Sequence, residues 1–159
     1  MPENTDNNTI IQLVTFKLGQ EEYAVDIQYV QEIIRIQEIT QVPDIPDFVE
    51  GIINLRGKII PIIDLQKRFK LKKYNDSEKT RIVVVEQNEK IIGLTVNSVK
   101  EVLNISTDKI EPPPSTVAGI GKEYLKGIGN LENRLLILLD LNSILLESEQ
   151  SELEKSNQI

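Results

Sequence analysis

Apolar and polar side chains alternate over short stretches along most of this chain. Alternation with a period of two predicts half-buried β-strands, and we expect them at residues 10–18, 23–27, 30–36, 51–55, 58–64, 81–86 and 91–96. Several of these stretches end at turn-forming pairs, such as Gly19-Gln20 and Arg56-Gly57. The apolar residues, 40% of the chain, are mostly Ile, Val and Leu. Because β-branched side chains favour strands, the pattern indicates a mostly β protein.

One short helix is expected where the strand at residues 58–64 ends. Asp64 stands where its carboxylate can accept hydrogen bonds from the first free amides of a helix, which predicts an N-cap and a helix over 65–69. A basic cluster follows, formed by Lys67, Arg68, Lys70, Lys72 and Lys73. We interpret it as a solvated helix end, where cations complement the helix dipole.

The second half of the chain repeats the first. Residues 23–34 align with 92–103 at an offset of 69, and residues 50–69 align with 126–145 at an offset of 76. The offset grows by seven residues, and the stretch 115–121 is a natural place for the additional loop. A duplicated unit is the simplest account of this pattern.

Each unit has about five short strands, and curling such a set into a small barrel removes exposed sheet edges. We therefore expect two linked five-stranded barrels with short helices, built from an internal duplication. The predicted domain covers residues 10–146, with one lobe at roughly 10–78 and the other at roughly 79–146, and strand exchange between the lobes is allowed for. Residues 1–9 and the acidic residues 147–159 are expected to be disordered tails.

Composition and charge exclude several classes of protein. With no Cys and no His, the chain has no thiol nucleophile, no Ser-His-Asp relay and no Cys-based zinc site. A net charge of −7 and an aromatic share of 4% disfavour a nucleic-acid-binding barrel. We expect no cofactor, no metal and no enzymatic activity. Without a signal pattern or an apolar run of membrane-spanning length, a cytoplasmic protein that does not insert into membranes is expected.

Asp64 and Asp140 are equivalent in the repeat, as are Asn54 and Asn130. Two such aspartates could form an acid/base pair, but a capping role explains both of them, and we favour it. Arg56 differs, because the second copy has Glu132 in its place, next to an Asn133 that also tolerates a left-handed turn. An arginine at a hairpin tip is either a solvated charge or a binding anchor, and the residues alone leave this open.

The residues also carry a family resemblance. Residues 21–33 (EEYAVDIQYVQEI), 42–65 (VPDIPDFVEGIINLRGKIIPIIDL) and 127–141 (GIGNLENRLLILLDL) resemble the CheW family of bacterial chemotaxis coupling proteins. The resemblance covers nearly the whole chain, roughly residues 10–146. It implies two SH3-like barrels around a shared core, and an adaptor that bridges methyl-accepting chemoreceptors and the histidine kinase CheA.

The resemblance also implies sites. In the family the helical hairpin tip of the receptor lies in a groove between the barrels, which places receptor contacts at Val30, Glu32, Gly51, Asn54, Leu55, Arg56 and Gly57. The kinase contacts the adaptor through its own homologous regulatory domain, barrel end to barrel end, and residues Val117, Ile120 and Lys122 are the expected contacts. The length of 159 residues suits the stand-alone adaptor. A CheW-like scaffold for a non-chemotaxis kinase pathway is the alternative.

Overall fold

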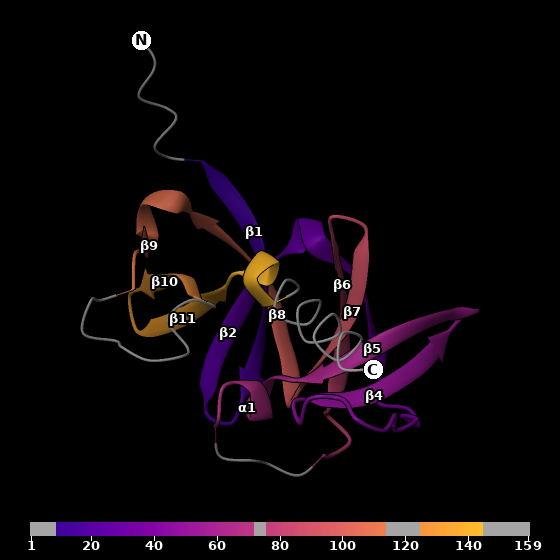
Figure 1. The fold of residues 1–159 in the computed structure, drawn as a ribbon. Helices are drawn as coiled ribbons and strands as arrows, with labels where there is room; N and C mark the ends of the chain where they lie inside the picture. Colours follow the sequence, from indigo (N-terminus) through magenta and orange to yellow (C-terminus); the bar gives the residue numbers. More distant parts are fainter. Residues whose placement is uncertain (1–8, 72–75, 114–124, 145–159) are drawn as a thin grey trace.

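A computed structural model describes residues 9–71, 76–113 and 125–144 of the chain, and within them strands predominate (Figure 1). The strands are β1 Ile10–Leu18, β2 Glu21–Asp26, β3 Val30–Arg35, β4 Val49–Leu55, β5 Lys58–Asp64, β6 Arg81–Gln87, β7 Lys90–Val96, β8 Ser98–Ser106, β9 Ile110–Glu111, β10 Leu125–Leu131 and β11 Arg134–Leu139. The helical elements are η2 Ile27–Tyr29, α1 Leu65–Arg68, η3 Thr107–Lys109 and a turn at residues 141–144.

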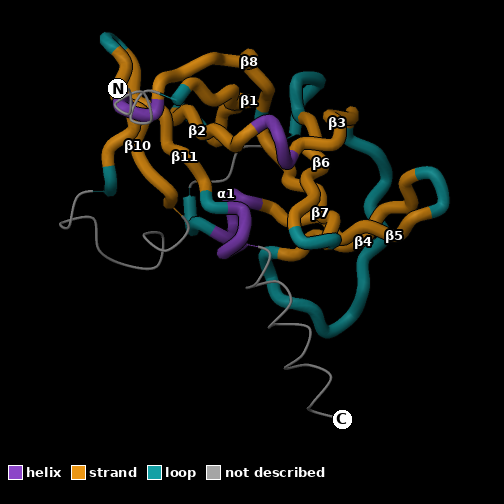
Figure 2. The backbone as a smooth tube through the Cα atoms, turned by 90° about the horizontal axis from the view of Figure 1, so that it is seen from above, coloured by secondary structure: helices purple, strands orange, loops and turns teal. Residues whose placement is uncertain are grey.

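The strands form two curled sheets. One has six strands in the order β8-β1-β2-β11-β10-β9, and the other has five in the order β3-β6-β7-β5-β4. Seen from above, β1, β2, β8, β10 and β11 lie on one side of the molecule and β3 to β7 on the other (Figure 2). The predicted fold class, a mostly β protein made of two SH3-like units from a duplication, is confirmed. Among the described residues, neither sheet closes into a complete ring of paired strands, and the sixth strand, the two-residue β9, was not expected.

Each sheet combines strands from both halves of the sequence. β1 and β2 leave the first half and join β8 to β11, while β6 and β7 join β3 to β5. Each join consists of one antiparallel pairing, β1 with β8 or β3 with β6, and one parallel pairing, β2 with β11 or β5 with β7. The registers repeat at the offsets of the sequence alignment: Leu138 pairs with Ala24 just as Ile62 pairs with Gly93. The sequence boundaries of the two lobes stay a prediction.

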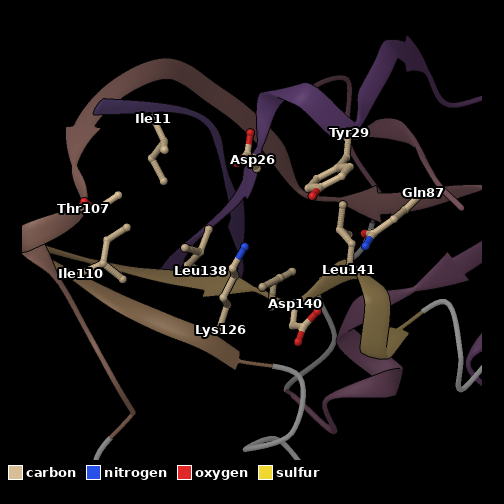
Figure 3. A pocket seen from close by; sticks show the side chains of 11 residues that line it. Ile11, Asp26, Tyr29, Gln87, Thr107, Ile110, Lys126, Leu138, Asp140 and Leu141 are labelled. Atoms are coloured by element: carbon tan, nitrogen blue, oxygen red, sulfur yellow. The ribbon is translucent and has the colours of Figure 1, made fainter. Parts of the chain in front are cut away.

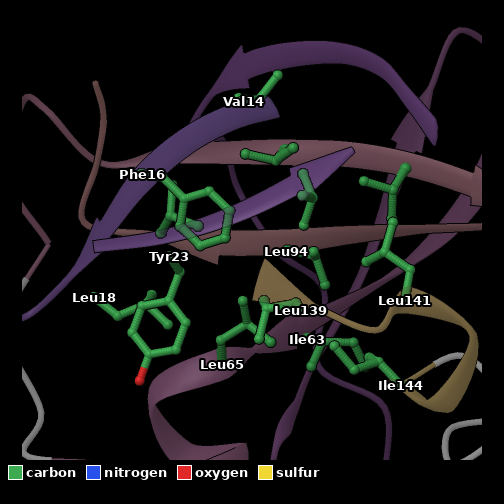
Figure 4. Close-up of a cluster of buried hydrophobic side chains, with 14 of the residues drawn as sticks. Val14, Phe16, Leu18, Tyr23, Ile63, Leu65, Leu94, Leu139, Leu141 and Ile144 are labelled. Atoms are coloured by element: carbon green, nitrogen blue, oxygen red, sulfur yellow. The ribbon is translucent and has the colours of Figure 1, made fainter. Parts of the chain in front are cut away.

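Three apolar clusters fill the molecule, and alternation along the strands divides the side chains among them. Ile82 and Val84 point into the interior of the five-stranded sheet, whereas Val83 and Val85 point into a central core between the sheets. Leu13 and Ala24 belong to a third cluster inside the six-stranded sheet. The central core is the largest of the three, and it includes Phe16, Tyr23, Leu94 and Leu139 (Figure 4). Strands that are buried on both faces, such as β6, have continuous Ile and Val runs, so the expectation of half-buried, alternating strands does not hold for them.

Asp64 and Asp140 cap the two helical turns, as the sequence predicted. The Asp64 carboxylate accepts from the backbone amides of Gln66 and Lys67, at 3.0 and 3.2 Å. The Asp140 carboxylate accepts from Asn142 and Ser143 in the same way, at 3.1 and 3.4 Å. The acid/base alternative therefore has no structural support, because helix capping accounts for both carboxylates.

Gly51 lets a loop cross the outer edge of β4. Thr40 exchanges two backbone hydrogen bonds of 2.9 Å with Ile52. This bridge is the equivalent, in the five-stranded sheet, of the pairing of β9 with β10 in the other sheet. Gly51 has a φ of +152°, and a Cβ there would come within 2.2 Å of the Thr40 carbonyl oxygen. Only glycine fits, so Gly51 has a structural role as well as its expected place in the receptor site.

We predict that Gly51→Ala lowers the free energy of unfolding by about 2–3 kcal/mol, because the added methyl group meets backbone atoms at a strained φ. Urea denaturation monitored by circular dichroism measures the change. The control is Gly57→Asn, where a Cβ meets nothing within 4 Å and asparagine tolerates the positive φ of 89°. A Gly51→Ala protein as stable as wild type would contradict the close approach of the Thr40 backbone to Gly51.

Candidate interaction site

The edge strand β3 presents apolar side chains to the junction between the sheets. Its pairing with β6 is irregular between Val30 and Glu32, and this bulge places Val30 opposite Val85 and Ile33 opposite Val83. Residues three apart face opposite sides of a regular strand, but a bulge turns them to the same side. Because Val83 and Val85 belong to the central core, Val30 and Ile33 border it too. Val30 packs against the core, and Ile33 is 40% exposed.

The edge strand β8 does the same from the other sheet. A register shift in its pairing with β1 places Val99 opposite Phe16 and Val102 opposite Val14, and both partners belong to the central core. Val99 packs against this core, while Val102 is 53% exposed. We call the four residues Val30, Ile33, Val99 and Val102 the junction strip. Val99 and Val102 were recognised in the sequence only as repeat partners, and the strand bulges explain why both copies face the same core.

A charged pair joins the two edges of the five-stranded sheet. The Arg56 guanidinium donates to both carboxylate oxygens of Glu32, with 3.3 Å between Nη1 and Oε1. β3 and β4 are the outermost strands of this sheet, so the pair can form only because the sheet curls. The sequence indicated no partner for Arg56, since Glu32 lies 24 residues away, but the structure provides one. The Arg56 side chain is still 69% exposed, so it is accessible to a second protein.

The Arg56-Gly57 turn is held by its own residues. Both have positive φ, 52° and 89°, and the Asn54 side-chain oxygen accepts from the Gly57 amide at 2.8 Å. The equivalent Glu132-Asn133 turn does not use the left-handed conformation that Asn133 would tolerate, since neither residue has a positive φ. Asn130 instead donates to Glu111. The equivalent asparagines therefore have different partners.

The other expected contact residues lie in three places. Leu55 is half-buried against the interior cluster of the five-stranded sheet. Gly51 lies farther along β4, under the Thr40 loop. The expected kinase contacts Val117, Ile120 and Lys122 lie outside the described residues. The structure thus joins Glu32 with Arg56 and places Asn54 to Gly57 at the tip of the β4–β5 hairpin, while Gly51 lies in the same hairpin, farther from its tip.

The six-stranded sheet has its own charged group, which the sequence analysis missed. Arg134 donates through Nε and Nη2 to the two carboxylate oxygens of Glu22, at 2.8 and 2.9 Å, and it also bonds Glu101 on β8. These bonds hold the pKa of Glu22 below its usual range and raise that of Arg134. Glu101 is the repeat equivalent of Glu32, so each edge strand has a Glu-Arg pair. The repeated Val-x-Glu pattern at residues 30–32 and 99–101 was the available signal.

A cavity of about 320 Å³ lies beside the six-stranded sheet, lined by Asp26, Tyr29, Lys126, Asp140 and apolar neighbours (Figure 3). The Asp26 carboxylate accepts from the backbone amide and the side chain of Gln28, at 3.0 and 3.2 Å. Asp140 is the helix cap described above. Both carboxylates are therefore used locally, and we assign no chemistry to this cavity.

Among residues 9–71, 76–113 and 125–144, no group of three or more acidic, His or Cys side chains could hold a metal ion. In the same ranges, no helix is both long and apolar enough to span a bilayer. What the described surface offers is apolar side chains beside ion pairs, on edge strands held by a rigid double-sheet core. These features define a protein-interaction module of two SH3-like units.

Comparison with known proteins identifies the family. The model of the CheW-like domain matches residues 12–149. The chemotaxis protein CheW of Klebsiella aerogenes is 37% identical over 140 residues, covering 88% of this chain and 84% of that protein. CheW of Treponema pallidum is 36% identical over 151 residues, covering 92% and 89%. The crystal structure of the scaffolding protein TtCheW from Thermoanaerobacter tengcongensis superposes with a TM-score of 0.78 at 42% identity, covering 84% of this chain and 86% of that one.

The chain belongs to the CheW-like family. This family consists of non-enzymatic adaptor and scaffold proteins of chemotaxis signalling, as the resemblance of the sequence implied. Its members couple chemoreceptors to the kinase CheA.

We predict that Glu22→Gln lowers the free energy of unfolding by about 1.5–3 kcal/mol at pH 7, the typical contribution of hydrogen bonds to a charged group. Because the pKa of Glu22 is lowered in the folded state, its contribution is present above the ordinary glutamate pKa of about 4.3 and is lost as pH falls further. Urea unfolding at roughly half-unit steps between pH 3 and pH 7 measures the free energy of unfolding of the variant and of wild type. The difference from wild type should shrink on acidification. Glu132→Gln, at an exposed position, is the control. A loss of stability in Glu22→Gln that does not change with pH would contradict the ion pair between Glu22 and Arg134.

Proposed function

We propose that this protein couples the hairpin tip of a chemoreceptor to the regulatory domain of the histidine kinase CheA, and that it does so in the cytoplasm. The observation that carries the proposal is the junction strip, whose Ile33 and Val102 are 40% and 53% exposed beside a rigid core. Exposed apolar side chains that border a core are suited to a helix that presents apolar anchors. A rigid surface also loses little conformational entropy on binding.

The receptor side would combine the junction strip with the Arg56 hairpin. Val30 belongs to the strip, and Glu32 follows it on β3 and holds Arg56. Gly57 and Asn54 fix the turn from which the Arg56 side chain projects, and Leu55 anchors the hairpin to the barrel interior. Gly51 contributes by keeping β4 in place under the Thr40 loop. In this proposal, the seven residues expected from the family resemblance act partly by contact and partly by support.

The kinase side must be separate, because an adaptor holds both partners at once. Two equivalent β-hairpins present large exposed apolar side chains, Ile59 on β5 and Leu135 on β11, which are 62% and 63% exposed. Ile59 lies in the hairpin whose tip carries Arg56, the proposed receptor anchor. Leu135 follows Arg134, which reaches β8, but neighbouring side chains point to opposite faces of a strand, so Leu135 faces away from that contact. We therefore assign the kinase contact to Leu135. The expected contacts Val117, Ile120 and Lys122 remain a prediction for the same partner.

We predict that Arg56→Glu weakens binding to a receptor cytoplasmic fragment about tenfold or more, the loss typical of a central arginine contact. Its fold should persist, since the second copy has Glu132 at this position. Calorimetric titration measures the affinity. The charge exchange Glu32→Arg with Arg56→Glu separates two roles: restored binding means that Arg56 acts by holding Glu32, and lost binding means direct contact. Wild-type affinity in the folded single variant would exclude Arg56 from the site.

We predict that Leu135→Glu weakens binding to the purified CheA regulatory domain about tenfold or more and leaves receptor binding unchanged, because the charge replaces an apolar contact. Ile59→Glu is the matched control at the equivalent position, and it should spare kinase binding. The same titration with Ile120→Asp tests the alternative surface. If neither Leu135→Glu nor Ile120→Asp affects the kinase, its binding face lies elsewhere. If wild type binds neither partner, a CheW-like scaffold of another kinase pathway becomes the better account.

A further inference from the structure

The junction strip is nearly symmetric. Val30 and Val99 are repeat equivalents, and so are Ile33 and Val102. Each pair occupies the same place beside a bulge, faces the same central core, and belongs to the edge strand of its sheet. An elongated ligand rotated by 180°, so that its contacts with β3 and β8 are exchanged, would therefore meet almost the same apolar surface. Apolar contacts of this kind are non-directional, so the strip by itself cannot determine which way round a ligand lies.

The charged residues beside the two strands break this symmetry. Next to β3 are Gln31, Glu32, Arg56, Lys58 and Ile91, together with Glu86, which bonds Gln31. Their repeat equivalents next to β8 are Lys100, Glu101, Glu132, Arg134 and Glu22, together with Lys17. Each set sums to zero net charge, so the asymmetry lies in the positions of the charges and not in their total. We call these groups the β3 rim and the β8 rim. At the hairpin tips the sign of the charge reverses, from Arg56 to Glu132.

The ion pairs of the two rims strengthen this contrast. On the β8 rim, Arg134 is bound by both Glu22 and Glu101, so its charge is neutralised within the protein. On the β3 rim, Arg56 meets the one carboxylate of Glu32 and stays 69% exposed. A ligand therefore meets an accessible cation beside β3. At the tip of the equivalent β10–β11 hairpin, whose Arg134 bonds Glu101 on β8, it meets Glu132, an exposed carboxylate.

We propose that the two rims determine the orientation of the helical hairpin on the junction strip, with Arg56 and Glu132 as the specificity-determining residues. The helix that has more acidic side chains near its tip lies along β3, and its less acidic partner lies along β8. Like charges placed together at an interface disfavour the reversed arrangement, whereas the apolar strip is neutral between the two. The inference rests on the proposed receptor contact and adds a direction to it.

Directional cross-linking tests the proposal, and the chain is suited to it because it has no cysteine. Gln31→Cys and Lys100→Cys place single thiols at exposed equivalent positions on the two rims. Each is mixed with a receptor hairpin fragment that has one cysteine on its more acidic helix, and disulfide yields are compared. We expect at least a fivefold preference for position 31. The double reversal Arg56→Glu with Glu132→Arg, which conserves net charge, should shift the preference at least fivefold toward position 100.

The charge-conserving exchange of Glu78→Lys with Lys79→Glu, away from both rims, is the control and should change nothing. If the double variant fails to fold, Glu132→Arg alone replaces it in the test. This single variant should bring the disulfide yields at positions 31 and 100 close together. Equal yields in wild type, or an unchanged preference in variants that still bind, would overturn the orientation rule and leave the receptor contact standing. A receptor fragment that binds neither wild type nor either cysteine variant would instead overturn the proposed function, and the inference with it.

Discussion

The central core depends on the exchange of strands between the two halves of the chain. Phe16 and Tyr23 come from strands of the first half that lie in the six-stranded sheet, whereas Val83 and Leu94 come from strands of the second half in the five-stranded sheet. The parallel pairings of β2 with β11 and of β5 with β7 join the halves through backbone hydrogen bonds. Neither half can complete a sheet alone, so the apolar surface of both is buried only when the whole domain folds. The two units are thus one cooperative structure.

The interaction surface follows from this arrangement. Because each half gives two strands to the other sheet, β3 and β8 are left as edge strands beside the core that the exchange creates. Exposed edges invite unwanted pairing, and bulges with charged residues are the usual protection. Here the same bulges turn Ile33 and Val102 toward the junction, and Glu32 and Glu101 hold arginines from neighbouring hairpins. The features that protect the edges are the features that form the proposed receptor surface.

Duplication also explains how one small domain can serve two partners. The conserved parts of the repeat, such as the Asp64 and Asp140 caps and the strand registers, are those that the fold requires. The parts that differ lie at the hairpin tips, where Arg56-Gly57 and Glu132-Asn133 have opposite charge and different backbone conformations. Surface positions diverge at little cost to stability. Two equivalent scaffolds can therefore present different surfaces.

The amino-acid sequence determined the strands, the caps, the duplication and the family, because each of these depends on patterns within a few residues or on direct alignment. Alternation predicted β1 to β7, and the repeat extended the pattern to β8, β10 and β11. The Asp64 cap needs only the amides that follow it. Only the tertiary structure decided which strands share a sheet, that Glu32 meets Arg56, and that Val30 and Ile33 face the same core. These depend on contacts between distant residues, such as Glu22 and Arg134, 112 positions apart. Their energy arises only when the curled sheets bring the partners together.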